Sequence, residues 1–164
     1  MRTLWMYQPF GRVNRMDRQH EAPRIVVGVD GSSSSQAALR WAVRYAALVS
    51  GRVEAVAAWD LPGAASWSAP AVDATFDEEE AERRLVEEVR TVLGEDGASR
   101  VHQRLVRGNP VDVLVDAAEG ADLLVVGSRG RGGFRRALLG SVSQQAAVHA
   151  PCPITIVRAD VSVP

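Results

Sequence analysis

Lysine is absent from this chain, and all 19 of its basic residues are arginine. The absence excludes several ways of handling phosphate or carbonyl groups: the lysine of a Walker A loop, the lysine of a receiver domain and a Schiff-base lysine. A phosphate site in this protein would therefore depend on main-chain amides, hydroxyl groups and arginines.

Cysteine is almost absent as well. Cys152 stands alone, so neither an intrachain disulfide nor a multi-cysteine zinc site can form. It lies between two prolines, and we expect a small buried side chain there rather than a nucleophile.

Long apolar runs and a surplus of charge are also missing. No stretch approaches the roughly 18 apolar residues that a membrane span needs, and residues 1–15 lack the apolar core of a secretory signal. The formal net charge of −1 argues against general nucleic-acid binding, which needs an excess of cations. We therefore expect a cytoplasmic protein whose partners include no membrane and no nucleic acid.

The length of 164 residues suits a single domain with one core. Residues 1–23 show neither helical nor strand periodicity, and we interpret them as a flexible N-terminal leader that the domain can lose. Met16 is an alternative start of the protein. The domain itself is expected over residues 24–164.

Apolar runs alternate with amphipathic segments after Pro23. Runs of β-branched residues predict buried strands, and apolar residues at helical spacing behind serine, acidic or Asn-Pro starts predict helices. Gly51 and Gly94 are expected to end the first two helices. The predicted strands are residues 24–30, 52–60, 100–108, 122–127 and 152–158, and the predicted helices are residues 32–51, 77–94, 109–120 and 141–150. Such alternation is typical of a doubly wound α/β fold, a mostly parallel sheet with helices on both faces.

Ligands of such folds bind beyond the carboxyl ends of the strands, and two loops there have an unusual composition. The first is GVDGS, at the end of the first strand; the second is GSRGRGGFRRALLGS, from Gly127 to Ser141. Gly127 would let a ligand approach the main chain. Gly130, Gly132 and Gly133 permit left-handed conformations, in which successive amides form an anion nest.

The second loop runs into a helix start. Gly140 and Ser141 open the fourth predicted helix, whose first amides lack helical partners and carry partial positive charge. The hydroxyls of Ser141 and Ser143 add donors on the same turn. Arg129 and Arg131 either contact phosphate or are merely solvated, and the residues alone do not decide between the two.

Asp30 ends the first predicted strand, where it can accept a hydrogen bond from a sugar hydroxyl or an adenine amino group. The alternative is a local Asx turn ahead of Gly31. Trp59 ends the second strand at the same edge, where it either faces an adenine or, as the favoured interpretation, packs in the core.

Gly127, Gly130, Gly140 and Ser141 spell G-x2-G-x9-G-S, which resembles the ATP-binding signature of the universal stress protein family. The segments IVVGVDGS, VVGSRGRGG and LLGSVSQQAAVHAPCPITIVR also look like that family, in the right order, over residues 24–158. The resemblance implies a five-stranded parallel sheet of order 3-2-1-4-5. Its winding would reverse between the first and fourth strands, where the two loops meet.

The resemblance also implies ATP as the ligand, with Mg²⁺ left open as its companion, and a set of binding residues. Two residues near the end of the first strand would flank the adenosine, the glycine-rich loop would wrap the ribose and phosphates, and the start of the fourth helix would hold the phosphate tail. In that order the implied residues are Gly28, Asp30, Gly127, Ser128, Arg129, Gly130, Arg131, Gly132, Gly133, Gly140, Ser141, Val142 and Ser143. A homodimer paired through the last strand, Ile154 to Val157, is implied as well, and such pairing would cover an apolar edge.

These features predict an ATP-binding universal stress protein that senses or buffers adenine nucleotide in stress response and growth regulation. No base stands out that could activate water, so we assign no catalytic residue and expect no enzyme. The alternatives are an interaction module without nucleotide, a slow ATPase, and a fragment of an NAD-dependent oxidoreductase. GVDGS disfavours the last, because it departs from G-x-G-x-x-G.

Overall fold

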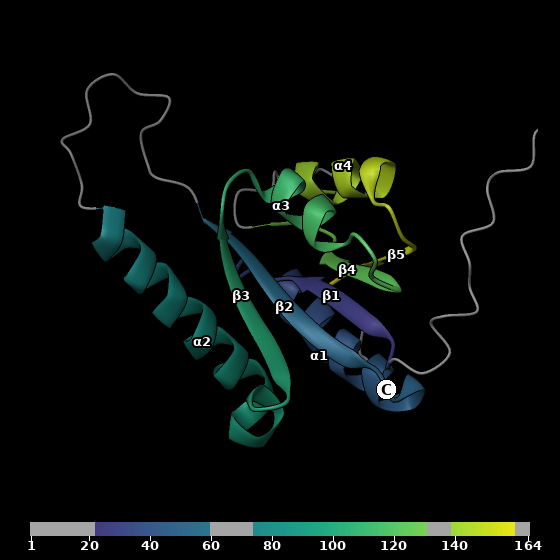
Figure 1. Cartoon of the computed structure of the whole chain (residues 1–164), viewed down its shortest axis with the longest axis horizontal. Coiled ribbons are helices and arrows are strands. Elements are labelled where there is room, and N and C mark those ends of the chain that lie inside the picture. Colours follow the sequence, from purple (N-terminus) through teal and green to yellow (C-terminus); the bar gives the residue numbers. More distant parts are fainter. Residues whose placement is uncertain (1–21, 60–73, 131–138, 160–164) are drawn as a thin grey trace, which may run out of the picture.

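The computed structural model describes residues 22–59, 74–130 and 139–159. Their five strands form one parallel sheet in the order β3-β2-β1-β4-β5 (Figure 1). The strands are β1 (Arg24–Gly28), β2 (Arg52–Trp59), β3 (Val101–Arg107), β4 (Leu123–Gly127) and β5 (Ile154–Val157), and the helices are α1 (Ser33–Val49), α2 (Ala74–Ala98), α3 (Pro110–Ala117) and α4 (Ser141–His149). The predicted fold class and strand order are confirmed.

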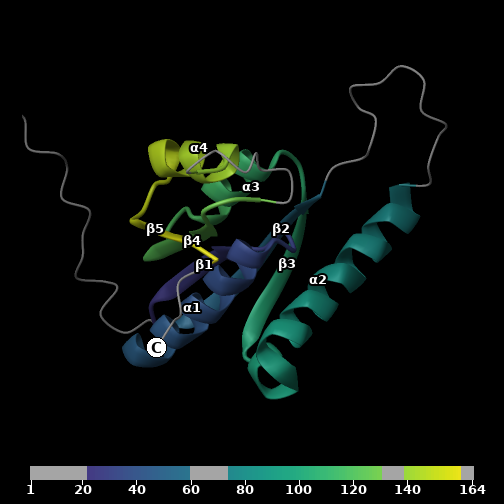
Figure 2. The same ribbon diagram turned by 180° about the vertical axis from the view of Figure 1, so that it is seen from behind.

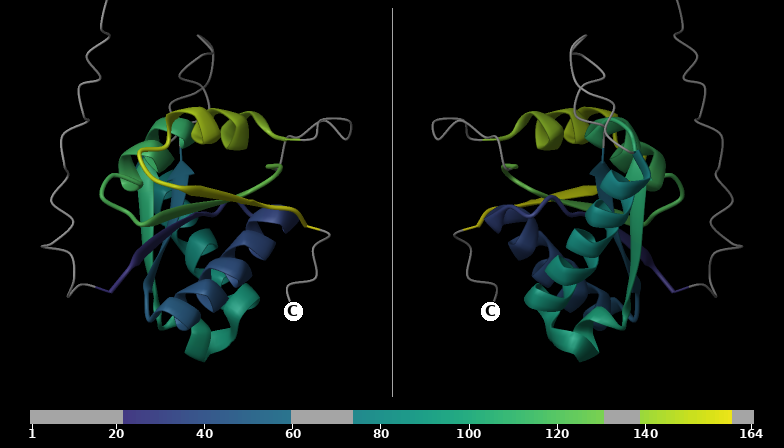
Figure 3. Two further views of the ribbon diagram at one scale, coloured as in Figure 1. Left: turned by 90° about the vertical axis from the view of Figure 1, so that its right-hand side faces the viewer. Right: turned by 90° about the vertical axis from the view of Figure 1, so that its left-hand side faces the viewer.

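Helices cover both faces of the sheet. Figure 2 shows the face that α1 and α2 cover, and the side views of Figure 3 place α3 and α4 on the other. Ile25 and Val27 of β1 face the core under α1 and α2, whereas Val26 faces the core under α3 and α4. Because both faces of β1 are buried, its sequence is a continuous apolar run instead of an alternating one.

Local chemistry explains where α1 and α3 begin. The hydroxyl of Ser32 accepts a hydrogen bond from the amide of Ser35 at 3.2 Å, which caps α1. The side chain of Asn109 accepts from the amide of Val111 at 2.9 Å, and Pro110 follows at the first helical position. Both starts agree with the sequence pattern.

Two helix ends differ in detail from the expectation. The left-handed residue after α1 is Ser50, with φ 53°. The next residue, Gly51, packs closely against the main chain of Pro23, because a Cβ on Gly51 would lie 2.8 Å from the Pro23 carbonyl oxygen. Gly94 has φ 72° and ψ 173°, so it interrupts α2, but helical turns resume as far as Ala98. Neither difference changes the layers of the fold.

The sheet brings two chain segments together at one edge. β1 and β4 are neighbours although most of the domain separates them in sequence, and β3 and β5 are the outer strands. The segments that follow Gly28 and Gly127 therefore leave the sheet side by side, where its winding reverses. Within the described residues, no helix has both the length and the apolarity that a membrane crossing needs.

Candidate functional site

A cavity of about 520 Å³ opens at the carboxyl ends of β1 and β4. Its walls come from the end of β1, the loop after β4, the start of α4, and apolar side chains of β2, β4 and α3. The lining includes these residues that the sequence analysis singled out: Gly28, Asp30, Gly127, Arg129, Gly130, Gly140, Ser141, Val142 and Ser143. The predicted residues Arg131, Gly132 and Gly133 lie outside the described residues.

The start of α4 at this cavity has no side-chain cap. Its N-cap residue is Gly140, in an extended conformation with φ −76° and ψ 161°, and the first intrahelical bond runs from the amide of Gln144 to the carbonyl of Gly140 at 3.0 Å. The amides of residues 141–143 therefore have no partner among the residues that the structure describes. α1 and α3, by contrast, carry a serine and an asparagine cap. The uncapped amides give this end of the cavity a partial positive charge.

Ser128 is buried, and its main chain holds the loop after β4 in place. Its amide donates to the carbonyl of Val157 at 2.7 Å, and its carbonyl accepts from the amide of Gly140 at 2.7 Å. The hydroxyl of Ser143 also donates to the Ser128 carbonyl at 3.1 Å, and to that of Gly140 at 2.9 Å. The single proton of Ser143 is thus engaged inside the protein, so the expectation that this hydroxyl donates to a ligand does not fit.

Asp30 forms the Asx turn that the sequence left open as one of two interpretations, and its second carboxylate oxygen faces the glycine-rich loop. Its Oδ1 accepts from the amide of Ser32 at 3.0 Å, which is the local Asx turn. Its Oδ2 points at the glycine-rich loop, because a Cβ on Gly130 would lie only 2.7 Å from that oxygen. The carboxylate therefore lies between the two loops and lines the cavity.

At Gly127 the start of α1 leaves no room for a side chain. A Cβ at this position would lie 2.7 Å from the carbonyl carbon of Ser34, and equally close to the amide nitrogen of Ser35. The start of α1 presses against the end of β4 at this point. We expected the glycine to admit a ligand to the main chain; the contact that requires it is with α1.

The sequence analysis missed a group of serines at the start of α1. Ser34 is buried, and its hydroxyl donates to the carbonyl of Arg129 and accepts from the amide of the same residue at 3.2 Å. The hydroxyl of Ser32 donates to the same carbonyl at 3.0 Å. Four consecutive serines signalled only a helix start; the loop that they hold is 95 or more positions away in sequence.

Other residues that drew attention in the sequence lie apart from these contacts. Trp59 belongs neither to the buried core nor to the lining of the cavity; the guanidinium of Arg107 lies over its ring, 5.6 Å from the centroid. Cys152 is partly buried against the core under α3 and α4, and burial raises the pKa of its thiol above the ordinary value. His102 and His149 are exposed. No group of three metal-ligating side chains occurs in the described part of the chain.

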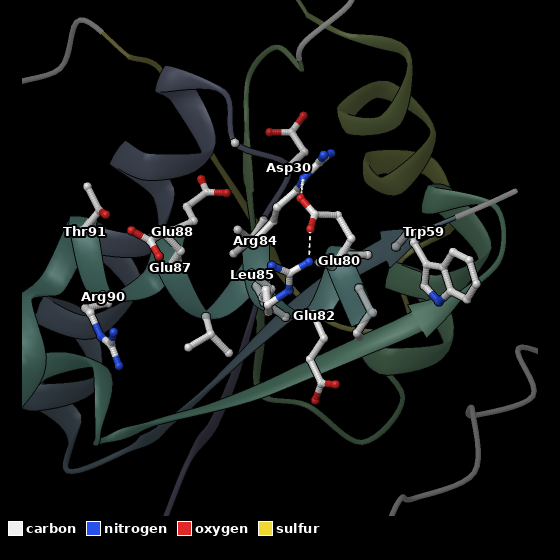
Figure 4. A pocket seen from close by; sticks show the side chains of 18 of the residues that line it. Asp30, Trp59, Glu80, Glu82, Arg84, Leu85, Glu87, Glu88, Arg90 and Thr91 are labelled. Carbon is white, nitrogen blue, oxygen red and sulfur yellow. Dashed lines mark hydrogen bonds and ion pairs between the residues drawn. The ribbon is translucent and has the colours of Figure 1, made fainter. Parts of the chain in front are cut away.

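A wider groove of about 1330 Å³ lies next to the cavity, between α2 and the sheet. Figure 4 shows its charged wall on α2, with Arg90 and Thr91 at one end, Trp59 at the other and Asp30 above the middle. Glu80 pairs there with Arg83 and, at 2.9 Å, with Arg84. The charged groups on the exposed face of α2 already pair with one another, whereas the uncapped amides of α4 are available to bind an anion. We therefore take the smaller cavity as the candidate site.

Comparison with known proteins agrees with this geometry. The universal stress protein family model matches residues 22–158. A universal stress protein of Mycolicibacterium smegmatis is 36% identical over 142 residues, which cover 83% of this chain and 48% of that protein. One from Methanocaldococcus jannaschii is 29% identical, covering 82% of this chain and 81% of the relative.

Among solved structures, a universal stress protein in complex with cAMP is 29% identical, with a TM-score of 0.63, and the match covers 84% of this chain and 98% of the other. The chain spans about half the length of the mycobacterial relatives that it matches. Family match, strand order and loop geometry agree, and the chain belongs to the universal stress protein family.

Proposed function

We propose that this protein binds an adenine nucleotide, with ATP as the principal ligand, in the cavity between the loops after β1 and β4. The observation that carries the proposal is the uncapped start of α4, whose free amides open into that cavity at the point where the sheet reverses its winding. Helix amides without partners favour anionic oxygens, and phosphate is the anion such sites most often take.

We assign the phosphates and the adenosine of the nucleotide to different parts of the cavity. The amides of Gly130 and of residues 141–143 would bind phosphate oxygens, and Arg129, which is exposed at the cavity, would add positive charge. Gly28 and the apolar side chains of β2 and α3 line the rest of the cavity, where adenosine would lie, and Asp30, whose Oδ2 faces Gly130, would lie between the adenosine and the phosphates. A carboxylate suits a sugar hydroxyl or an amino group, and it would repel phosphate. Residues 131–133 stay predicted ligands, and Mg²⁺ would enter only with the phosphates.

The related protein that was solved with cAMP supports an adenine nucleotide as the ligand class. We propose further that nucleotide is sensed or buffered in the cytoplasm, during stress response and growth regulation, rather than consumed. Turnover should then stay below about 1 per second, the lower end of ordinary enzymes. A rate above that value would identify an ATPase instead.

Two further expectations belong to the same proposal. Residues 24–164 would form the nucleotide-binding unit, and residues 1–23 would be a leader without a role in binding; residues 1–21 lie outside the described residues. Two chains would pair through β5, an outer strand of the sheet.

The decisive experiment has two parts. Mass spectrometry of purified protein after denaturation identifies any small molecule that it retains, and isothermal titration then compares ATP, AMP, cAMP and NAD. We expect an adenine nucleotide to co-purify and ATP to bind more tightly than NAD. No heat of binding with ATP at millimolar concentration would instead favour an interaction module without nucleotide.

A further inference from the structure

We infer that Ser34 is a positioning residue for the loop after β4, residues 128–130. Its hydroxyl holds the main chain of Arg129, so that the amide of Gly130 faces the cavity. The inference rests on the proposed function, because it assigns the residue that prepares the phosphate end of that site. Ser34 itself does not line the cavity.

The hydroxyl of Ser34 meets both polar groups of one residue. It donates to the carbonyl of Arg129 and accepts from the amide of Arg129 at 3.2 Å. Ser34 is only 3% exposed, so water does not compete freely for these bonds. A hydroxyl has one proton and two lone pairs, which is enough for both interactions at once.

This contact sets the direction of the next peptide group. In a trans peptide, the carbonyl of one residue and the amide of the next point in opposite directions, and the described chain contains no cis peptide. Because the carbonyl of Arg129 is directed at the serines of α1, the amide of Gly130 is directed away from them. Gly130 lines the cavity, and a Cβ on Gly140 would lie 3.5 Å from its nitrogen. The serine contact therefore turns a donor, not an acceptor, towards the place for phosphate.

The hydroxyl can act in this way because α1 is fixed. Ser34 lies in the first turn of a helix that buries Ala38, Leu39 and Ala42 in the core. The missing side chain of Gly127 lets this turn approach the end of β4 to contact distance. A loop held from such a helix keeps its geometry before any ligand arrives, which lowers the entropic cost of binding.

The neighbouring serines have other tasks, and this makes Ser34 the informative position. Ser32 caps α1 as well as reaching Arg129, and the hydroxyl of Ser35 donates to the carbonyl of Ser32 at 3.1 Å. Ser33 is exposed. Among the described residues, the hydroxyl of Ser34 bonds the main chain of Arg129 and meets the hydroxyl of Ser32 at 3.3 Å.

The test compares Ser34→Ala with Ser33→Ala, which removes an exposed hydroxyl from the same turn. Isothermal titration with ATP and an NMR titration with adenosine give the two affinities. We expect Ser34→Ala to weaken ATP about tenfold, the worth of roughly one net hydrogen bond, and to leave adenosine almost unchanged, since adenosine carries no phosphate. Ser33→Ala should change neither. A general structural role would weaken both ligands together, and that result, or no loss at all, overturns the inference.

Hydrogen exchange separates this inference from the proposed function. In the folded Ser34→Ala protein, the Arg129 amide should exchange faster and the Gly130 amide resonance should shift, while Ser33→Ala leaves both as in the wild type. If the wild type binds neither ATP nor adenosine, the proposed function fails, but these two changes still support the positioning role. Unchanged exchange and unchanged resonances in Ser34→Ala overturn it whatever the protein binds.

Discussion

Gly127 and Gly140 belong to one sequence signature, but different contacts surround them. At Gly127 the space for a Cβ is filled by the main chain of α1 at 2.7 Å. At Gly140 the nearest atoms lie 3.4–3.6 Å away, and they belong to the loop of residues 128–130 that borders the cavity. The first glycine therefore affects the stability of the fold, and the second affects access to the candidate site.

Gly127→Ala should destabilise the protein by about 1–3 kcal/mol, because main-chain atoms of α1 must shift to admit the methyl group. Chemical unfolding followed by circular dichroism gives the free energy. Gly140→Ala is the matched control: its backbone is extended and its methyl group meets only ordinary contacts, so less than about 1 kcal/mol should be lost there. Equal losses in the two variants would contradict the assignment.

Gly140→Val should remove most nucleotide binding while the fold survives. The branched side chain would lie over the amide of Gly130 and the start of α4, where phosphate is expected. An extended residue accepts valine without strain, so the unfolding temperature should change little. We expect ATP to bind more weakly by about tenfold or more in isothermal titration. Unchanged affinity would mean that phosphate lies elsewhere.

Residue roles were the part of this protein that its sequence predicted least well. The glycine signature led to a loop that lines the candidate cavity, and Asn109 and Ser32 were recognisable caps because their partners are two and three positions away. The partner of Ser34 is 95 positions away, so nothing local separates it from the other serines around it. The hydroxyl of Ser143 was misjudged for a related reason, since its acceptor at Ser128 depends on how the loop folds back.

At the scale of elements, the helices differ in how their first turns are satisfied. α1 and α3 have side-chain caps and lie beside the candidate site, whereas α4 opens into it without one. The cap of α3 is therefore assigned to stability and the open start of α4 to binding. A cap removed from α3 should cost stability alone.

Asn109→Ala should lower the free energy of unfolding by about 1 kcal/mol, because the amide of Val111 loses its acceptor. Asn109→Asp keeps an oxygen in place and should retain most of that stability. Urea unfolding curves of the two variants and the wild type provide the comparison. A loss as large in the aspartate variant as in the alanine variant would show that the cap is not the cause.

Element order was predictable because apolar patterns alternate cleanly along the chain. Boundaries were less so. Glycine predicted a break at Gly94, and the left-handed conformation there agrees, but helical turns resume as far as Ala98. After α1, the left-handed residue is Ser50 and Gly51 instead fits against Pro23, a contact that no local pattern could reveal. Residue propensity therefore predicts roughly where a helix ends, but tertiary packing determines which residue adopts the left-handed conformation there.

At the scale of the whole molecule, β5 is one of the two outer strands of the described sheet, and we propose that it pairs with a second chain. The carbonyls of Pro153 and Val157 accept from β4 at 2.9 and 2.7 Å. Because polar groups alternate along a strand, the main-chain groups of Ile154 and Ile156 point away from the sheet. Their side chains are half-buried, and the edge is apolar. Among the described residues no strand pairs with this edge, and an outer strand of this kind can accept a second strand.

The proposed homodimer makes a prediction that sedimentation can check. The wild type should have twice the mass of one chain at micromolar concentration. Ile156→Pro should be a monomer, because proline removes the outward amide and leaves the bonds to β4 intact. The control is Thr155→Val: the main-chain groups of residue 155 face β4 and keep their bonds, so this variant should remain a dimer. A wild type that stays monomeric at 100 times that concentration would refute pairing through β5.

The bond between the Ser128 amide and the Val157 carbonyl joins the edge strand to the end of the cavity where we propose that phosphate binds. The Ser128 carbonyl in turn accepts a hydrogen bond from the amide of Gly140, the residue before α4. Two hydrogen bonds therefore connect the edge where two chains would associate with the place where nucleotide would bind. Any cooperativity through this link is reciprocal: if loading with ATP tightens self-association, self-association must raise the affinity for ATP by the same factor. A protein built in this way could report nucleotide level as a change in assembly, without consuming the molecule it measures.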